Sequence, residues 1–162
     1  MSDIALVVAI AQNGVIGDHG KIPWRISDDM KQFKAVTLGK PCIMGRKTWD
    51  SLPRKPLPGR TNIVLTRDSA FSAPDAAIVY TLDEALAFAA GEQPQEIMIL
   101  GGADLYRATL PRAARVYLTE VHRDFAGDAH FDFDRRGWRE RSREDRTTPE
   151  GLAYSFVTLE RI

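Results

Sequence analysis

The chain has 162 residues, of which 44% are hydrophobic and 27% are charged, and its 22 basic side chains balance its 22 acidic ones. This composition excludes a disordered chain, and the balanced charge argues against a general nucleic-acid-binding protein, which would carry a basic excess. The length favours a single domain over residues 1–162, large enough to bury a hydrophobic core.

Cysteine content and hydropathy bear on the compartment. The single cysteine, Cys42, excludes an internal disulfide, and its place in an apolar run predicts a buried thiol rather than a nucleophile. The longest apolar run, residues 4–11, is too short to span a membrane. The acidic Asp3 and the missing basic N-terminal region argue against a signal peptide. We therefore expect a cytoplasmic protein.

The first predicted element is a strand over residues 4–11. It is apolar on both faces, which is typical of a central strand in a sheet covered on both sides. A loop containing Gly14, Gly17 and Gly20 follows. Glycine-rich loops between a strand and a helix are either mobile lids or plain surface loops, and composition alone leaves both readings open.

The second predicted element is a helix over residues 27–38, with Ser27 as its N-cap. Asp29, Phe33 and Val36 follow the i, i+4, i+7 spacing that lines one helical face, and this face should turn toward the interior. Burying a carboxylate costs free energy unless a partner satisfies it. No nearby cation lies on the same face, so the partner of Asp29 could be a ligand.

Asp28 should differ from Asp29. It falls on the other side of the helix, together with Gln32, and we expect both to face water. Acids in a first helical turn often only cap the free N–H groups and complement the helix dipole. The local sequence therefore leaves two readings of Asp29 open, a capping acid or a ligand-binding acid.

Cations follow the next two predicted strands. A short buried strand at 41–45 leads into a helix that opens with Arg-Lys-Thr at 46–48, and a strand at 62–66 is followed by Arg67. Free N–H groups, two cations and a hydroxyl at a helix start suit a phosphate, although a solvated basic turn would have the same residues. In one parallel sheet these cations would meet at the edge where α/β proteins bind ligands.

A strand at 77–80, a helix with a capping box at 81–84 that ends at Ala90, and a buried strand at 96–100 come next. The last of these strands runs directly into a Gly-Gly pair at 101–102 and a helix over 104–109. A glycine pair either lets the backbone approach a diphosphate closely or simply forms a tight turn.

The last third of the chain predicts strands at 115–121, 138–146 and 152–160, with a turn at 149–151. We expect an antiparallel hairpin at the edge of a mostly parallel sheet. Its arginine-rich strand interleaves acids, which favours a solvated edge over a nucleic-acid surface. No metal site is expected, because His19, His122 and His130 lack the spacing of metal ligands.

Six stretches in chain order carry a family resemblance. They are residues 15–17 with 22–24, Asp29 with 33–34, 43–49, 57–60, 97–102 with Tyr106, and 117–119 with 127–128. Together they resemble bacterial dihydrofolate reductases of the chromosomal type, essentially from end to end. The resemblance implies a three-layer α/β fold with a predominantly parallel eight-stranded sheet, flanking helices and an antiparallel C-terminal edge hairpin. It also implies reduction of 7,8-dihydrofolate to tetrahydrofolate by NADPH, with hydride transfer to C6 and protonation of N5.

The resemblance assigns a substrate site to Val7, Asp29, Met30, Phe33, Leu52, Leu57, Arg60 and Thr119. Asp29 would accept two parallel pterin donors and favour protonation of N5, while Thr119 would hydrogen-bond Asp29. Arg60 would take the glutamate α-carboxylate. Because Asp29 should lie too far from N5, a water admitted near Ile22 and Trp24 is the expected proton donor, and Asp29, Trp24 and Ile22 are the expected catalytic residues.

The resemblance places the cofactor beside Ala9, Val15, Ile16, Gly17, Gly45, Arg46, Lys47, Thr48, Thr66, Arg67, Gly101, Gly102, Ala103, Leu105 and Tyr106. The cationic members of this set favour NADPH over NADH, because they suit the 2′-phosphate. The family further implies a monomer that binds small-molecule substrate and antifolate inhibitors, with no nucleic-acid or membrane partner.

Three departures from the family pattern affect these expectations. Asp104 stands where some relatives carry a cation, which should weaken the grip on the 2′-phosphate unless Arg67 compensates. Ile22 stands where methionine is common, and an extra residue near Arg54 and Lys55 leaves open which of them approaches the substrate. The alternatives are a related-fold reductase acting on a ribosylamino-pyrimidine, which has no need of the buried acid, and a non-catalytic nucleotide-binding module.

Overall fold

The computed structural model describes residues 2–162. The strands are β1 (Asp3–Ala11), β2 (Val15–Gly17), β3 (Pro41–Gly45), β4 (Thr61–Leu65), β5 (Ala77–Val79), β6 (Glu96–Ile99), β7 (Arg115–Val121), β8 (Ala129–His130), β9 (Trp138–Thr147) and β10 (Ala153–Arg161). The helices are α1 (Ser27–Thr37), α2 (Arg46–Ser51), α3 (Leu82–Ala90), α4 (Ala103–Thr109) and the 3-10 helix η1 (Leu110–Arg112). Within residues 2–162, none of the helices has the length and apolar composition needed to cross a membrane.

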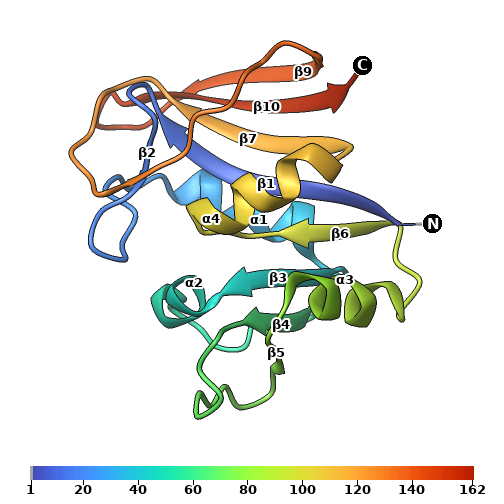
Figure 1. Cartoon of the computed structure of the whole chain (residues 1–162). Helices are drawn as coiled ribbons and strands as arrows, with labels where there is room; N and C mark the ends of the chain where they lie inside the picture. The colour runs from blue at the N-terminus through green and yellow to red at the C-terminus, as the bar shows by residue number, and fades with distance from the viewer. Residues whose placement is uncertain (1) are drawn as a thin grey trace.

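Eight of the strands form one sheet in the order β5-β4-β3-β6-β1-β7-β10-β9 (Figure 1). The pairings from β5 to β7 are parallel, whereas β10 is antiparallel to both β7 and β9. The predicted fold class is therefore confirmed, including the antiparallel edge hairpin. Two short strands, β2 and β8, pair separately in an antiparallel ribbon.

Two hydrophobic clusters cover the two faces of the sheet, because successive side chains of a strand point to opposite faces. In β1, Leu6 belongs to the cluster beneath α3 and α4, while Ala5 belongs to the cluster that includes Trp49 of α2 and is packed by Phe33 of α1. Figure 1 shows α3 and α4 in front of the sheet and α1 behind it. This double burial explains why the sequence of β1 is apolar from residue 4 to residue 11.

The entry into α1 differs from the predicted one. Ser27 is the first helical residue rather than the N-cap, and the preceding Ile26, in an extended conformation, provides no side-chain cap. Ile26 is buried in a third hydrophobic cluster with Trp24 and Phe156. Packing of Ile26 therefore fixes where the helix begins, and the capping propensity of Ser27 is not used.

Parallel strands bring their carboxyl ends to one edge of the sheet. Helix α2 starts at this edge directly after β3, and α4 starts there after a three-residue turn that follows β6. The loop that follows β2 lies at the same end of the molecule (Figure 1). In open α/β sheets this edge is where ligands bind. The functional site should accordingly be sought there.

Candidate active site

A cleft of about 1350 Å³ runs along the carboxyl edge of the sheet. It extends from Asp29 and Thr119 at one end to Tyr80 and Thr81 at the other. The strand order β7-β1-β6-β3-β4-β5 spans five interstrand spacings of about 4.8 Å, or roughly 24 Å across the sheet. Pockets for a single small ligand are typically about 300–1,000 Å³, so this cleft has room for two molecules side by side.

Asp29 lies at the β7 end of the cleft. Its Oδ1 accepts a hydrogen bond of 2.6 Å from Oγ1 of Thr119, which lies on β7 beside Ala9 of β1. Burial raises the pKa of Asp29, and the Thr119 hydrogen bond offsets part of that rise. Phe33 and Val36 line the cleft beside Asp29, as their helical spacing predicts. An acid held in this way can receive two hydrogen-bond donors of a ligand.

Asp28 is 41% exposed, in keeping with the expected solvent-facing side, but it also has partners in the protein. Its Oδ2 accepts hydrogen bonds from Arg146 of β9 at 3.1 Å and from the Tyr154 hydroxyl of β10 at 3.3 Å. Gln32, expected on the same solvent-facing side, is half-buried and lines the cleft. Asp28 therefore ties α1 to the edge hairpin rather than capping the helix.

The loop after β2 flanks the cleft near Asp29. Ile22 is 58% exposed and lines the cleft, whereas Trp24 is buried and packs edge-on against Phe125 with ring centroids 5.2 Å apart. Within residues 2–162, Nε1 of Trp24 has no hydrogen-bond partner. A buried N–H donor without a protein partner is a position where an ordered water can bind.

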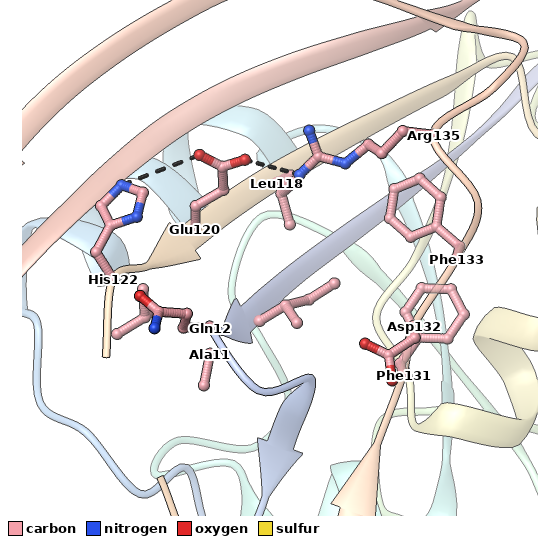
Figure 2. A pocket seen from close by; sticks show the side chains of 11 residues that line it. Ala11, Gln12, Leu118, Glu120, His122, Phe131, Asp132, Phe133 and Arg135 are labelled. Atoms are coloured by element: carbon pink, nitrogen blue, oxygen red, sulfur yellow. Dashed lines mark hydrogen bonds and ion pairs between the residues drawn. The ribbon is translucent and has the colours of Figure 1, made fainter. Parts of the chain in front are cut away.

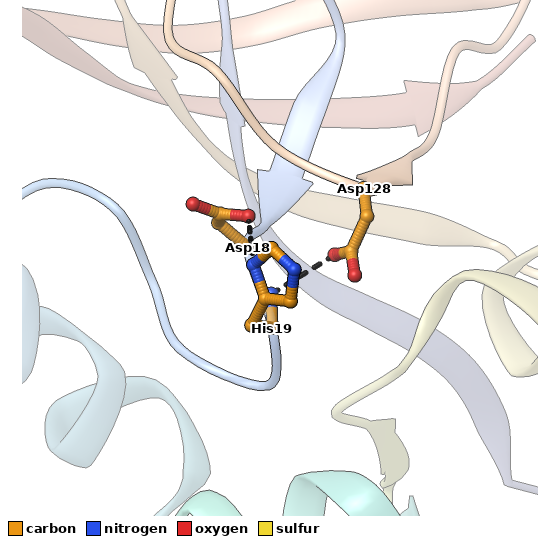
Figure 3. A group of neighbouring side chains, drawn as sticks. All are labelled: Asp18, His19 and Asp128. Atoms are coloured by element: carbon orange, nitrogen blue, oxygen red, sulfur yellow. Dashed lines mark hydrogen bonds and ion pairs between the residues drawn. The ribbon is translucent and has the colours of Figure 1, made fainter.

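Figure 3 shows how the same loop is fastened to the segment before β8. Asp128 accepts a hydrogen bond of 3.0 Å from the backbone N–H of His19, and this bond lowers the pKa of Asp128. The imidazole Nδ1 of His19 lies 2.7 Å from Oδ1 of Asp18. The bond between His19 and Asp128 joins the two loops across 109 positions of sequence, whereas the contact between His19 and Asp18 lies within one loop.

The middle of the cleft is built from two glycines and several cations. The N–H of Gly45 donates to the carbonyl of Gly101 at 2.8 Å, and a Cβ on Gly101, where φ is +106°, would lie 2.9 Å from the ring of Tyr106. Gly102 has open space where a side chain would stand. A side chain is thus excluded at Gly101, and the backbone at Gly102 is open to a ligand.

Arg46, Lys47 and Arg67 supply positive charge beside this turn. Arg46 pairs with Asp68 at 3.1 Å and stacks over the Phe71 ring at 5.0 Å, which fixes its direction. In the part of the chain that the structure describes, neither Lys47 nor Arg67 forms an ion pair. A ligand with phosphate groups would meet these cations from the open cleft.

Comparison with known proteins agrees with this geometry. The family model described as dihydrofolate reductase matches residues 3–161. The chain belongs to the dihydrofolate reductase family. It is 47% identical to the dihydrofolate reductase of Neisseria gonorrhoeae over 97% of both chains, and 40% identical to that of Mycobacterium tuberculosis (strain H37Rv) over 99% of both. This placement disfavours the related reductase that acts on a ribosylamino-pyrimidine.

A solved structure of the family has the same fold. Dihydrofolate reductase from Enterococcus faecalis, complexed with NADP(H) and RAB-propyl, superposes with a TM-score of 0.89 at 30% sequence identity. The match covers 98% of this chain and 96% of the other. The architecture is therefore that of a dihydrofolate reductase throughout.

Most residues that the family resemblance places at the site line the cleft. They are Val7, Ala9, Ile16, Gly17, Ile22, Asp29, Phe33, Gly45, Arg46, Lys47, Thr48, Thr66, Arg67, Gly102, Ala103, Leu105, Tyr106 and Thr119. Val15, Trp24 and Gly101 are buried behind its surface. Met30, by contrast, is 56% exposed and does not line the cleft. Met30 was expected to form part of the substrate site, but it lies outside the surface of the cleft.

Leu52, Leu57 and Arg60 lie next to the cleft rather than on its surface. Leu57 is buried and Leu52 half-buried in the cluster that Phe33 also joins. The guanidinium of Arg60 is 6.0 Å from the centroid of the Phe33 ring and donates to Oγ1 of Thr37 at 3.1 Å. Arg60 is thus held beside the cleft residue Phe33, where a long substrate could reach it.

The sequence did not predict the residues that line the cleft at the end opposite Asp29. Leu65, Tyr80, Thr81 and Leu82 line it there, at the ends of β4 and β5. The signal was available, since in a parallel sheet the residue that follows strand β5 must lie at the same edge as Arg67. Gln32 was missed for a different reason, because helical spacing alone placed it with Asp28.

A second, smaller pocket of about 300 Å³ lies between β1, β7 and residues 131–135 (Figure 2). Three of its polar residues, Glu120, His122 and Arg135, have partners within the protein. Glu120 lies between His122 and Arg135, with 2.7 Å to the Arg135 guanidinium, and Nε2 of His122 lies 2.8 Å from Oγ of Ser155. Because protein partners satisfy these groups, the main cleft remains the candidate active site of this reductase-family protein.

Proposed function

We propose that the chain reduces 7,8-dihydrofolate to 5,6,7,8-tetrahydrofolate, with NADPH as the reductant. One observation carries the proposal. The half-buried Asp29, fixed by Thr119, shares a cleft with the cations Arg46, Lys47 and Arg67. This pair of ligands requires an acid for the pterin and, farther along the same cleft, cations for the phosphates.

Asp29 binds and polarises the pterin. Among residues 2–162, Thr119 is the only side chain that hydrogen-bonds the Asp29 carboxylate, and it uses Oδ1 alone. Oδ2 and the second lone pair of Oδ1 therefore remain for the exocyclic amine and the ring N–H of the pterin, which donate in parallel, one to each oxygen. Val7 and Phe33 supply apolar walls. Within this partly desolvated site, the negative charge of Asp29 favours protonation of the pterin at N5.

The proton reaches N5 through water. Trp24 offers a buried Nε1–H without a protein partner, which can hold a water near the exposed Ile22. The loop from residue 18 to residue 24 then controls how much water enters the site. NADPH, when bound, supplies the hydride that C6 of the pterin accepts. We include Asp29, Trp24 and Ile22 in the proposed catalytic set for these reasons.

The backbone and side chains that line the cleft are suited to binding NADPH. The open backbone at Gly102 permits close approach of a diphosphate. Thr48, Thr66, Lys47 and Arg67 offer hydroxyl and cationic donors to phosphate oxygens. The cationic group near Arg67 suits a 2′-phosphate, and we therefore propose a preference for NADPH over NADH.

Two accompanying properties belong to the same proposal. We expect the protein to act as a cytoplasmic monomer, which size-exclusion chromatography would test. We also expect 2,4-diaminopyrimidine antifolates to bind, because a protonated diaminopyrimidine forms a charged pair with Asp29.

The proposal is tested by following dihydrofolate-dependent oxidation of NADPH across pH, in the wild type and in Asp29→Asn. We expect the variant to bind NADPH as the wild type does. It should lose at least about 100-fold in turnover at neutral pH, the lower range for acid–base catalysis. Turnover should recover in part at low pH, where substrate is already protonated. Full activity of Asp29→Asn at neutral pH would refute the assigned role, and a wild type without activity would refute the function.

A further inference from the structure

The cleft has a branch at its Asp29 end that the proposed reaction does not use. Helix α1 and the strands β7 and β10 line it, through Gln32, Val36, Tyr117, Phe156 and Thr158. We call this space the β10 branch. In the strand order β10 lies beyond β7, whereas the strands followed by Arg46 and Arg67 lie on the other side of β7. The β10 branch therefore extends away from the cations proposed for NADPH.

The register of the sheet brings the strand residues of the β10 branch together. Thr119 of β7 pairs with Phe156 of β10, and Tyr117 pairs with Thr158. Residues paired in this way point to the same face of the sheet, with Cβ atoms about 4.5–5.5 Å apart. This face is turned toward α1, because Thr119 donates to Asp29 at 2.6 Å. Tyr117 and Thr158 consequently lie on the same face as Thr119, farther from the carboxyl edge.

Helix α1 supplies the opposite wall. Asp29, Gln32 and Val36 follow the i, i+3, i+7 spacing of one helical face. The hydrogen bond from Thr119 fixes Asp29 at the mouth of the branch, so Gln32 and Val36 lie farther in, one and two turns along the helix. Because residues of both walls line the cleft, the helix and the two strands leave space between them here.

Two polar side chains of the β10 branch are neutral and free. Gln32 and Thr158 are both half-buried, and within residues 2–162 neither side chain forms a hydrogen bond. The Tyr117 hydroxyl, by contrast, donates to Glu96 at 2.9 Å. A glutamine amide offers donors and an acceptor, and a threonine hydroxyl offers both as well. A ligand that both donates and accepts hydrogen bonds would satisfy the two free groups.

The charged groups around the β10 branch are already paired. Lys40 pairs with Glu96 at 2.7 Å, and Arg146 pairs with Asp28 at 3.1 Å. These cations lie 5.7 Å and 5.1 Å from the centroids of the two aromatic rings of the branch. A buried charge without a partner costs far more free energy than a neutral group that is hydrogen-bonded. The branch therefore suits an uncharged ligand better than an ion.

We propose that the β10 branch is a second ligand site, which binds a small uncharged aromatic carboxamide while the rest of the cleft is occupied. The carboxamide of the ligand exchanges hydrogen bonds with the Gln32 amide and bonds the Thr158 hydroxyl. The aromatic ring packs against Val36 and Phe156. This site is separate from the one proposed for substrate and NADPH, so it does not depend on the proposed function.

The test uses benzamide as the probe. It is titrated into the wild type with NADPH and a 2,4-diaminopyrimidine at saturation, and NMR follows the side-chain amide of Gln32 and the methyl groups of Val36 and Thr158. We expect saturable shifts with a dissociation constant of about 1 mM, an ordinary value for a ligand of this size. Benzoate, which has the same shape and a negative charge, should bind at least about tenfold more weakly.

Three variants locate the site. Gln32→Trp should abolish benzamide binding, because the indole fills the branch and the amide is lost. Thr158→Val keeps the shape and loses the hydroxyl, and it should weaken binding about two- to tenfold, the equivalent of one hydrogen bond. Lys31→Trp is the matched control, since Lys31 is exposed on the same helix and does not line the cleft. This variant should bind benzamide as the wild type does.

Thermal melting checks the folding of each variant. Equal benzamide affinity of the wild type and a folded Gln32→Trp would overturn the inference, and Thr158→Val decides if the tryptophan variant does not fold. Displacement of benzamide by the diaminopyrimidine would also overturn it, because the probe would then lie in the main cleft. Benzoate that binds as tightly as benzamide would refute the uncharged class of ligand. A wild type that binds benzamide but not NADPH would overturn the proposed function alone.

Discussion

Thr119 donates a hydrogen bond of 2.6 Å to Oδ1 of Asp29, although 90 positions separate the two residues in the chain. The bond opposes the effect of burial, because it stabilises the charged form of the acid. Replacing Thr119 by the nearly isosteric valine should therefore raise the pKa of Asp29 further. NMR titration of the Asp29 carboxyl carbon measures this directly. Thr119→Ser, which keeps the hydroxyl, should retain the wild-type pKa, and an unchanged pKa in the valine variant would show that the bond has no such effect.

Burial of Asp29 should also cost the protein stability. Since its pKa is raised in the folded state, the folded protein holds the proton more tightly than the unfolded chain does, whose aspartate pKa is about 3.9. Stability contributed by the protonated form is thus lost as pH rises through the folded pKa, and at neutral pH the full cost is present. Asp29→Asn should raise the free energy of unfolding there by roughly 0.5–2 kcal/mol, a common range for stabilising changes.

Urea unfolding at neutral and acidic pH measures this gain, which should vanish below a pH of about 3.9, where both states are protonated. Asp28→Asn provides the comparison. Asp28 lies 3.1 Å from Arg146 and already has a partner, so its replacement should bring no gain. A gain from Asp29→Asn that is the same at every pH would have another origin than the desolvated charge.

Asn62 organises the loop that carries Arg60. Its Oδ1 accepts the N–H of Leu57 at 2.8 Å, and its Nδ2 donates to the carbonyls of Leu57 and Arg60, both at 3.0 Å. Because Asn62 is only 3% exposed, Asn62→Ala would leave these backbone groups unpaired. We expect a loss of about 2 kcal/mol or more in unfolding free energy.

The same variant should affect substrate binding selectively. With Arg60 less firmly placed, KM for dihydrofolate should rise, whereas KM for a dihydropterin substrate without the glutamate should stay constant. Thr61→Ala, which removes a bond to Glu92 on the other side of the strand, serves as control and should change neither KM. A parallel rise for both substrates would indicate general loosening of the site instead.

The sequence predicted those features that depend on local spacing. The apolar run of β1 indicated a strand buried on both faces, and the helical stripe through Asp29, Phe33 and Val36 indicated which acid faces inward. The sequence did not predict contacts between segments that lie far apart along the chain. The pairing of β2 with β8 joins strands of three and two residues, too short to show a periodic pattern. The pairing of Asp28 with Arg146 was not predicted because Arg146 lies 118 positions away, on a hairpin whose packing against α1 has no local signal.

Asp104 lines the cleft close to Gly102, where its negative charge should oppose NADPH, but it is paired with Arg107. The two side chains are 2.7 Å apart and line the cleft together. Arg107→Ala should leave the Asp104 charge unbalanced and weaken NADPH binding about two- to fivefold, as expected for an exposed pair. In an Asp104→Ala background the same change should have no effect, because no charge is left to neutralise. Affinities measured at low and high salt complete this double-mutant cycle, and the coupling should shrink as salt rises. An equal loss in both backgrounds would mean that Arg107 contacts the cofactor itself.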